Sequence, residues 1–205
     1  MDGSTFIKKF RAAAVDEAEP YLWSDDLVLS YLDEAQVQFC VETEGLPDRV
    51  DVEIGAGDAM VAIPPYVLKI RKAILRSNGR ELDLISEESL AAPRSGVPRA
   101  VVVDGVMNTL TFDAVQSDSD RVILSVFRLP RKPVSHINDR VETPRQFDSV
   151  LMHYALHLAF SRPDADTYDK VKATTHLESF MLGCRDAERS MGRRRKPNHA
   201  TNFSW

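Results

Sequence analysis

Hydrophobic residues recur with a helical period at both ends of the chain. Residues 4–15, 24–45 and 143–162 place apolar side chains three or four positions apart, which predicts amphipathic helices. Ser4 and Ser24 are placed to accept the first free N–H groups as N-caps, and Thr143-Pro144 begins the clearest helix. A longer last helix is expected over about 164–190, with Gly192 as its stop.

Between these helices the pattern changes to alternation. Val50, Val52 and Ile54 alternate with acidic residues, and the turn sequence 55–58 leads into the apolar segment 60–63, which predicts a β-hairpin. Further elements are expected as a helical turn at 86–90 and as strands at 81–84, 100–103, 109–112 and 121–129. Segment 66–75 is apolar and basic, and it fits either a strand or the approach to a helix.

This order of elements predicts an α+β protein that is mainly helical. Helices from residues 1–48 and 142–191 would pack into a bundle, and residues 49–134 would form an inserted β lobe of short antiparallel strands. Residues 192–205 would form an extended C-terminal arm. No run of about 18 apolar residues predicts a membrane span, and the N-terminus does not have the pattern of a secretion signal.

The charges are distributed unevenly along the chain. The net charge is −5, but segment 192–205 has four basic residues and no acidic one, whereas the rest holds 22 basic and 31 acidic residues. A basic arm on an acidic body is typical of an arm that has its own partner.

The arm carries the candidate partner-binding residues. Its cations suit acidic groups, and its two aromatic side chains suit apolar pockets on another protein. The alternatives are a solvated tail and a contact with nucleic acid, although an acidic body does not have the wide basic footprint of a dedicated DNA-binding protein. The candidate residues are Arg193, Arg194, Arg195, Lys196, His199, Phe203 and Trp205.

Other candidate chemistry is sparse, and we expect no enzyme activity, cofactor or metal. His153 and His157 are four apart on a helix, a spacing that suits two metal ligands, but no third ligand is evident and two ordinary polar-face histidines are the simpler interpretation. Cys40 and Cys184 lie on apolar stripes and are interpreted as buried thiols, with a disulfide or a metal pair as the alternative. No nucleophile elbow, Walker loop or dinucleotide fingerprint is present.

The succession of short motifs over about residues 21–190 resembles the head-to-tail adaptor (connector, or head-completion) proteins of tailed bacteriophages. The opening helix, the strand-then-proline step and the closing pair of helices each have a counterpart in this sequence. The matching segments are 23–27 with 31–35, 62–65, 68–70, 79–82, 86–90, 96–98, 110–112, 122–128 and the two helices after Thr143.

The resemblance implies a structural virion protein at the neck, present in the host cytoplasm during assembly. Such adaptors form a ring, usually of twelve copies, under the portal, extend the DNA channel without gripping DNA, and contact tail or stopper proteins. In several relatives a C-terminal arm lies along the portal, a use that 193–205 would fit. The remaining alternatives are another tail-completion or stopper protein, or a nucleic-acid-binding module that uses the basic tail.

Overall fold

The chain divides into two compact units, which are described separately. A computed structural model describes residues 1–163 and 166–195, the last four of these by their backbone alone. The helical unit comprises Met1–Thr43 and Lys132–Trp205, and the β unit comprises Glu44–Arg131. No helix among the described residues is long and apolar enough to cross a membrane.

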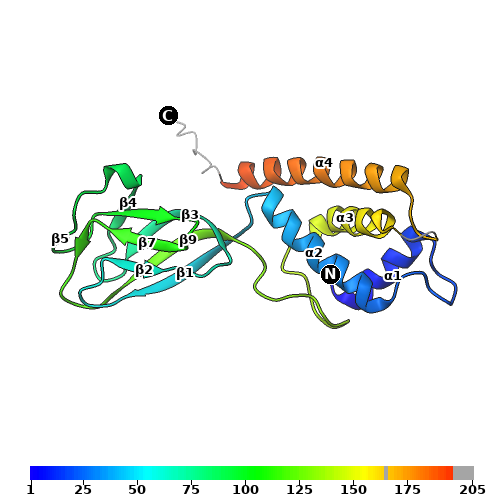
Figure 1. Ribbon diagram of the computed structural model, residues 1–205, viewed down its shortest axis with the longest axis horizontal. Helices are drawn as coiled ribbons and strands as arrows, with labels where there is room; N and C mark the ends of the chain where they lie inside the picture. Colours follow the sequence, from blue (N-terminus) through cyan, green and yellow to red (C-terminus); the bar gives the residue numbers. More distant parts are fainter. Residues whose placement is uncertain (164–165, 196–205) are drawn as a thin grey trace, which may run out of the picture. The chain divides into compact units, whose positions relative to one another are not determined.

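The helical unit contains four α-helices among its described residues, and α3 contacts the other three (Figure 1). Asp2, and not the expected Ser4, caps the first helix by accepting the Thr5 N–H at 2.8 Å. Ser24 caps the second as predicted, accepting the Leu27 N–H at 3.4 Å. A short 3-10 turn (Arg145–Phe147) separates Thr143 from the third. The helices are α1 (Gly3–Ala14), α2 (Asp25–Glu42), α3 (Asp148–Ser161) and α4 (Lys170–Arg195).

Aromatic side chains fill the core of the helical unit. Trp23, which precedes α2, is 1% exposed and meets two phenylalanine rings edge-on. Its ring centroid lies 5.7 Å from that of Phe10 on α1 and 5.8 Å from that of Phe160 on α3. Edge-to-face contacts of this kind add to the free energy gained by burying the rings, so Trp23 ties α1 to α3.

Polar side chains of α2 hold the segment 132–143 that leads back from the β unit. The fully buried Gln36 accepts the Glu142 N–H at 3.3 Å. Asp33 accepts the Val134 N–H at 2.8 Å and one amide N–H of Gln36 at 3.0 Å. These bonds satisfy backbone groups of a segment that has no regular structure of its own.

The β unit is a mixed sheet that curls round a single apolar core (Figure 1). Its strand order is β1-β9-β3-β4-β6-β7-β2, antiparallel throughout except for the parallel pair β4–β6, and β5 and β8 form a separate parallel pair. A 3-10 turn occupies Glu87–Ser89, where a helical turn was predicted. The strands are β1 (Leu46–Ile54), β2 (Met60–Ala62), β3 (Val67–Leu75), β4 (Glu81–Ile85), β5 (Arg94–Ser95), β6 (Ala100–Asp104), β7 (Thr109–Phe112), β8 (Ala114–Val115) and β9 (Asp120–Arg128).

The prediction of a mainly helical protein is wrong, because the β unit is a large seven-stranded sheet and not a lobe of short antiparallel strands. β1, β3 and β9 each have nine residues. The start of β1 was missed because Pro47 resembles a break. β1 is an edge strand, which is where a sheet tolerates proline.

The predicted hairpin between segments 50–54 and 60–63 is also wrong. The Asp58 carboxylate accepts the Gly55 N–H at 3.0 Å, so the turn exists, but β1 pairs with β9 and β2 pairs with β7. The hairpin of β6 and β7 across Asp104-Gly105 is confirmed. Segment 66–75, left open above, is the strand β3, whose two register shifts disturb its alternation.

Candidate functional site

The predicted arm begins on a helix. The backbone of Arg193, Arg194 and Arg195 forms the end of α4, which continues past Gly192 and so differs from the expected stop. Arginine is a good helix former and an interior glycine costs only about 1 kcal/mol, so the helix tolerates Gly192. Lys196, His199, Phe203 and Trp205 lie outside the described residues.

The C-terminal half of α4 presents an exposed apolar and basic face. Leu182 is 59% exposed, and Arg185 and Arg189 follow three and seven positions later, which places all three on one side of the helix. The opposite side of α4 is buried (Ala173, Phe180, Cys184, Ala187). The spacing of the arginines was available in the sequence, but the burial that leaves Leu182 outside was not.

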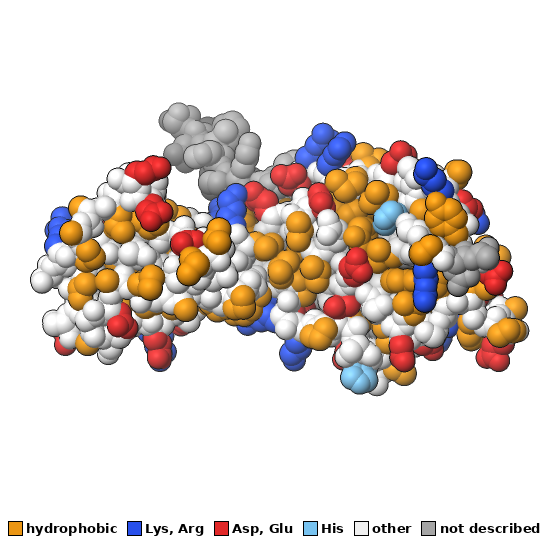
Figure 2. Space-filling model, in the orientation of Figure 1, with side chains coloured by type: hydrophobic (Ala, Val, Ile, Leu, Met, Phe, Trp, Pro, Cys, Tyr) orange, Lys and Arg blue, Asp and Glu red, His pale blue; other side chains and the backbone are white. Residues whose placement is uncertain are grey.

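A groove of about 550 Å³ lies between α2 and the segment 133–135. The carboxyl groups of Asp26, Asp33 and Glu34 are at its edge, and among the described residues Asp26 and Glu34 make no ion pair. Figure 2 shows carboxylates and apolar side chains interspersed on the drawn face of the helices. The groove was not predicted from the sequence, and its apolar lining is Leu29, Val37, Pro133 and Val134.

The structure separates the two histidines that were considered as a metal pair. His153 Nδ1 lies 3.1 Å from Nδ1 of His176 on α4, whereas His157 Nδ1 lies 2.9 Å from the Ala173 carbonyl oxygen. One ring of the first pair must donate and the other accept, so a single shared proton lies between the two Nδ1 atoms. Burial lowers the pKa of both His153 and His176, and the charges of neighbouring histidines and of Lys172 lower that of His176 further.

The histidines and cysteines of the described part of the chain also bear on the sequence-based interpretation. No group of three histidine, cysteine or carboxylate side chains there is arranged to hold a metal ion. Cys40 and Cys184 are both buried, as interpreted from the sequence, and no disulfide joins them. Burial raises the pKa of Cys184 to about 12, so its thiol is a poor nucleophile near neutral pH.

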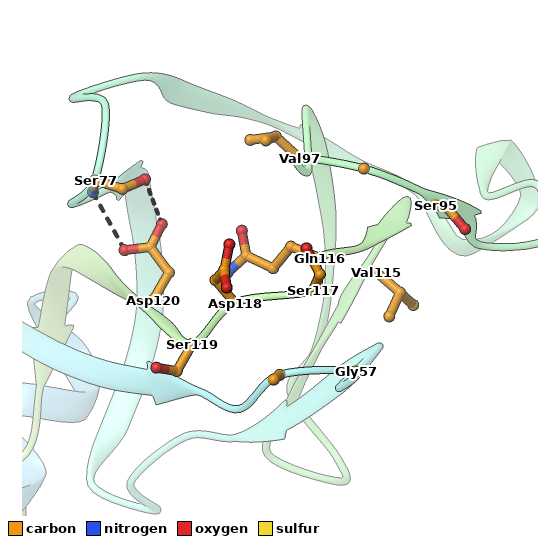
Figure 3. A pocket seen from close by; sticks show the side chains of 12 residues that line it. Gly57, Ser77, Ser95, Val97, Val115, Gln116, Ser117, Asp118, Ser119 and Asp120 are labelled. Carbon is orange, nitrogen blue, oxygen red and sulfur yellow. Dashed lines mark hydrogen bonds between the residues drawn. The ribbon is translucent and has the colours of Figure 1, made fainter.

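The β unit has an open polar hollow of about 650 Å³ at the end of the sheet that carries the β8–β9 turn (Figure 3). Asp120 accepts the Ser77 hydroxyl at 2.6 Å and the Ser77 N–H at 3.2 Å, which joins two of its walls. The rest of the lining is mainly serine, glycine and valine, together with Gln116 and Asp118, and no histidine, lysine or cysteine lines it. The hollow therefore offers hydrogen-bond donors and acceptors, and its Ser77 hydroxyl bonds directly to the Asp120 carboxylate.

A comparison with protein families adds a match over almost the whole chain. The model of the family described as SU10 adaptor protein matches residues 1–201. No curated protein matches the sequence.

Proposed function

Because the chain belongs to the SU10 adaptor protein family, a family of phage head-to-tail adaptors, we propose that it forms a ring under the portal and joins the capsid to the tail. This membership confirms the resemblance to phage head-to-tail adaptors that the sequence motifs indicated. It also makes the chain a phage structural protein. The match over residues 1–201 is the observation that carries the proposal.

In the proposed assembly, copies of the chain, twelve in the expected ring, surround the DNA channel at the virion neck. The acidic body, with 31 acidic residues against 22 basic ones, would keep the wall from holding DNA by its phosphates. Tail or stopper proteins would bind the side of the ring away from the portal.

The C-terminal segment is the proposed contact with the portal. The last turn of α4 would carry Arg193–Arg195 to the portal surface, and Lys196, His199, Phe203 and Trp205 would complete the contact. Charge-assisted bonds of arginine to carboxylates, together with buried aromatic side chains, are the usual strong points of such interfaces.

Mixing the purified full chain with the portal protein of the same phage tests this function. We expect rings on the portal in electron micrographs. A variant without residues 196–205 should keep the helical signal in circular dichroism but bind the portal more weakly. A variant with Phe203 and Trp205 changed to alanine should bind the portal more weakly than the full chain and more tightly than the truncated one. Equal portal binding by all three proteins would contradict the role of the arm.

The same preparation separates the adaptor from the nucleic-acid-binding alternative. Binding to duplex DNA with a steep dependence on salt concentration, lost when Arg193–Arg195 become glutamine, would favour a DNA contact. The adaptor proposal predicts that these arginines matter for portal binding and that DNA affinity is weak in the full chain.

A further inference from the structure

We propose that the groove on α2 receives the exposed α4 face of a second copy, with Leu182 on the apolar floor and Arg185 and Arg189 beside the carboxylates at the edge. This inference rests on the proposed ring, and it names the two surfaces through which neighbouring copies would touch. Both surfaces belong to the helical unit.

The groove is suited to a basic and partly apolar occupant. Apolar side chains from α2 and from segment 133–134 line it, while Asp26 and Glu34 have exposed side chains and make no ion pair among the described residues. Val37, one turn beyond Glu34, is half-buried in the groove. A cation on this edge would therefore meet unneutralised charge next to apolar surface.

The α4 face has the complementary composition. Leu182 is 59% exposed although its helix buries other apolar residues, so burying it against a partner would remove apolar surface from water. Arg185 makes no ion pair among the described residues, and Arg189 makes only an exposed one to Asp186 at 3.7 Å. This face, with a large apolar side chain next to two guanidinium groups, complements a groove that has apolar lining and carboxylates at its edge.

The spacing of the two faces matches in an antiparallel arrangement. Glu34 and Ser30 lie three and seven residues before Val37, and Arg185 and Arg189 lie three and seven residues after Leu182. With about 1.5 Å of rise per residue in both helices, placing Leu182 on Val37 brings Arg185 to Glu34 and Arg189 to Ser30, which lies about one helical turn from both Asp26 and Asp33. A parallel arrangement would not align these pairs.

The contact joins two different faces, so it is head-to-tail, and repetition of such a contact generates a ring when the rotation between copies closes, as the proposed seating on the portal would require. In one copy, the Arg185 face points away from the side of α4 that packs on α3, and no bond joins it to the α2 groove among the described residues. Exposed ion pairs contribute little affinity and mainly steer association. The contact is therefore weak by itself, and we expect isolated copies to be monomeric until the portal brings them together.

A charge-reversal cycle on the full chain tests the pairing. Glu34→Arg and Arg185→Glu should each raise the concentration needed to fill the portal by roughly tenfold or more, and the double variant should restore assembly. The number of copies bound per portal is measured by native mass spectrometry. Glu87→Arg and Arg80→Glu, at exposed positions of the β unit, are the matched controls and should have no effect. Equal assembly by all variants overturns the inference.

A second measurement does not depend on the portal. Copies carrying Glu34→Cys are mixed at high concentration with copies carrying Arg185→Cys and oxidised. The buried Cys40 and Cys184 should not compete. A mixed disulfide dimer supports the pairing even if no ring forms on the portal. The absence of a ring would then overturn only the proposed function. If rings form but the mixed dimer is absent, the function stands and the pairing is wrong.

The groove could instead hold another segment. If Glu34→Arg prevents even a first copy from binding the portal and Arg185→Glu does not restore it, the portal itself occupies the groove. If loss of residues 196–205 has the same effect on copy number as Glu34→Arg, and the two changes together add nothing, the arm occupies it. Either result overturns the inference.

Discussion

The contact between α3 and α4 depends on a residue without a side chain, and changing it gives a quantitative test of the helical unit. A Cβ added at Gly183 would lie 2.8 and 2.9 Å from the two methyl groups of Val150, closer than such carbons normally approach. Valine in a helix strongly prefers one rotamer, so Val150 cannot easily turn away. We therefore expect Gly183→Ala to destabilise the contact between the two helices.

Two opposing effects determine the magnitude. Alanine in place of glycine inside a helix is favourable by about 1 kcal/mol, whereas overpacking costs roughly 1–3 kcal/mol. We expect Gly183→Ala to lower the free energy of unfolding by about 1 kcal/mol in the natural background. In a Val150→Ala background, where the methyl groups are absent, the same change should raise it by roughly 1 kcal/mol.

Urea denaturation of the four proteins, followed by far-ultraviolet circular dichroism, measures this cycle, because the four described α-helices all belong to the helical unit. The expected coupling between the two sites is about 2 kcal/mol, within the range for residues in direct contact. Thr174→Ala, on the exposed side of α4, is the control and should change stability by less than about 0.5 kcal/mol. The reasoning is refuted if Gly183→Ala stabilises both backgrounds equally.

Three further changes test other parts of the molecule. Trp23→Ala should destabilise the helical unit by about 3–5 kcal/mol, because it leaves a cavity between α1 and α3, and a loss below about 1 kcal/mol in urea melts would contradict that packing. The pKa values of His153 and His176 lie below 6.5 in the folded chain, so the unfolded chain binds more protons below that pH and stability falls as the pH decreases through this window. Melting temperatures at about pH 7.5 and about pH 5 should show this decrease, and His176→Asn should reduce it; an unchanged pH dependence would count against the shared proton. Gln36→Leu removes the acceptor for the Glu142 N–H and should lower the melting temperature more than Gln38→Leu on the same helix, and equal effects would mean that the segment 132–143 is not held there.

Local patterns in the sequence were sufficient to place the helices approximately and to find several of the strands. The N-cap at Ser24, the helix after Thr143 and the turn at Asp104-Gly105 each depend on residues a few positions apart, whose hydrogen bonds are short-range. The family resemblance drew on the same local features, and the family match confirms it.

The tertiary structure alone decided which strands meet. β1 and β2 are joined by a turn yet pair with β9 and β7, because pairing depends on burial across the whole sheet and not on the nearest alternating segment. The bulges of β3 and Pro47 at the sheet edge hid strands from the local pattern for the same reason.

The candidate contact surfaces divide in a similar way. The sequence by itself determined the basic and aromatic composition of 193–205 and the spacing of Arg185 and Arg189. Only the packing of α4 on α3 decided that Leu182 faces outward, and only the folding of segment 133–135 against α2 made a groove beside Glu34. Exposure is a property of the packed molecule, because a helix can turn any one of its apolar stripes toward the core, and the neighbouring helices determine which one is buried.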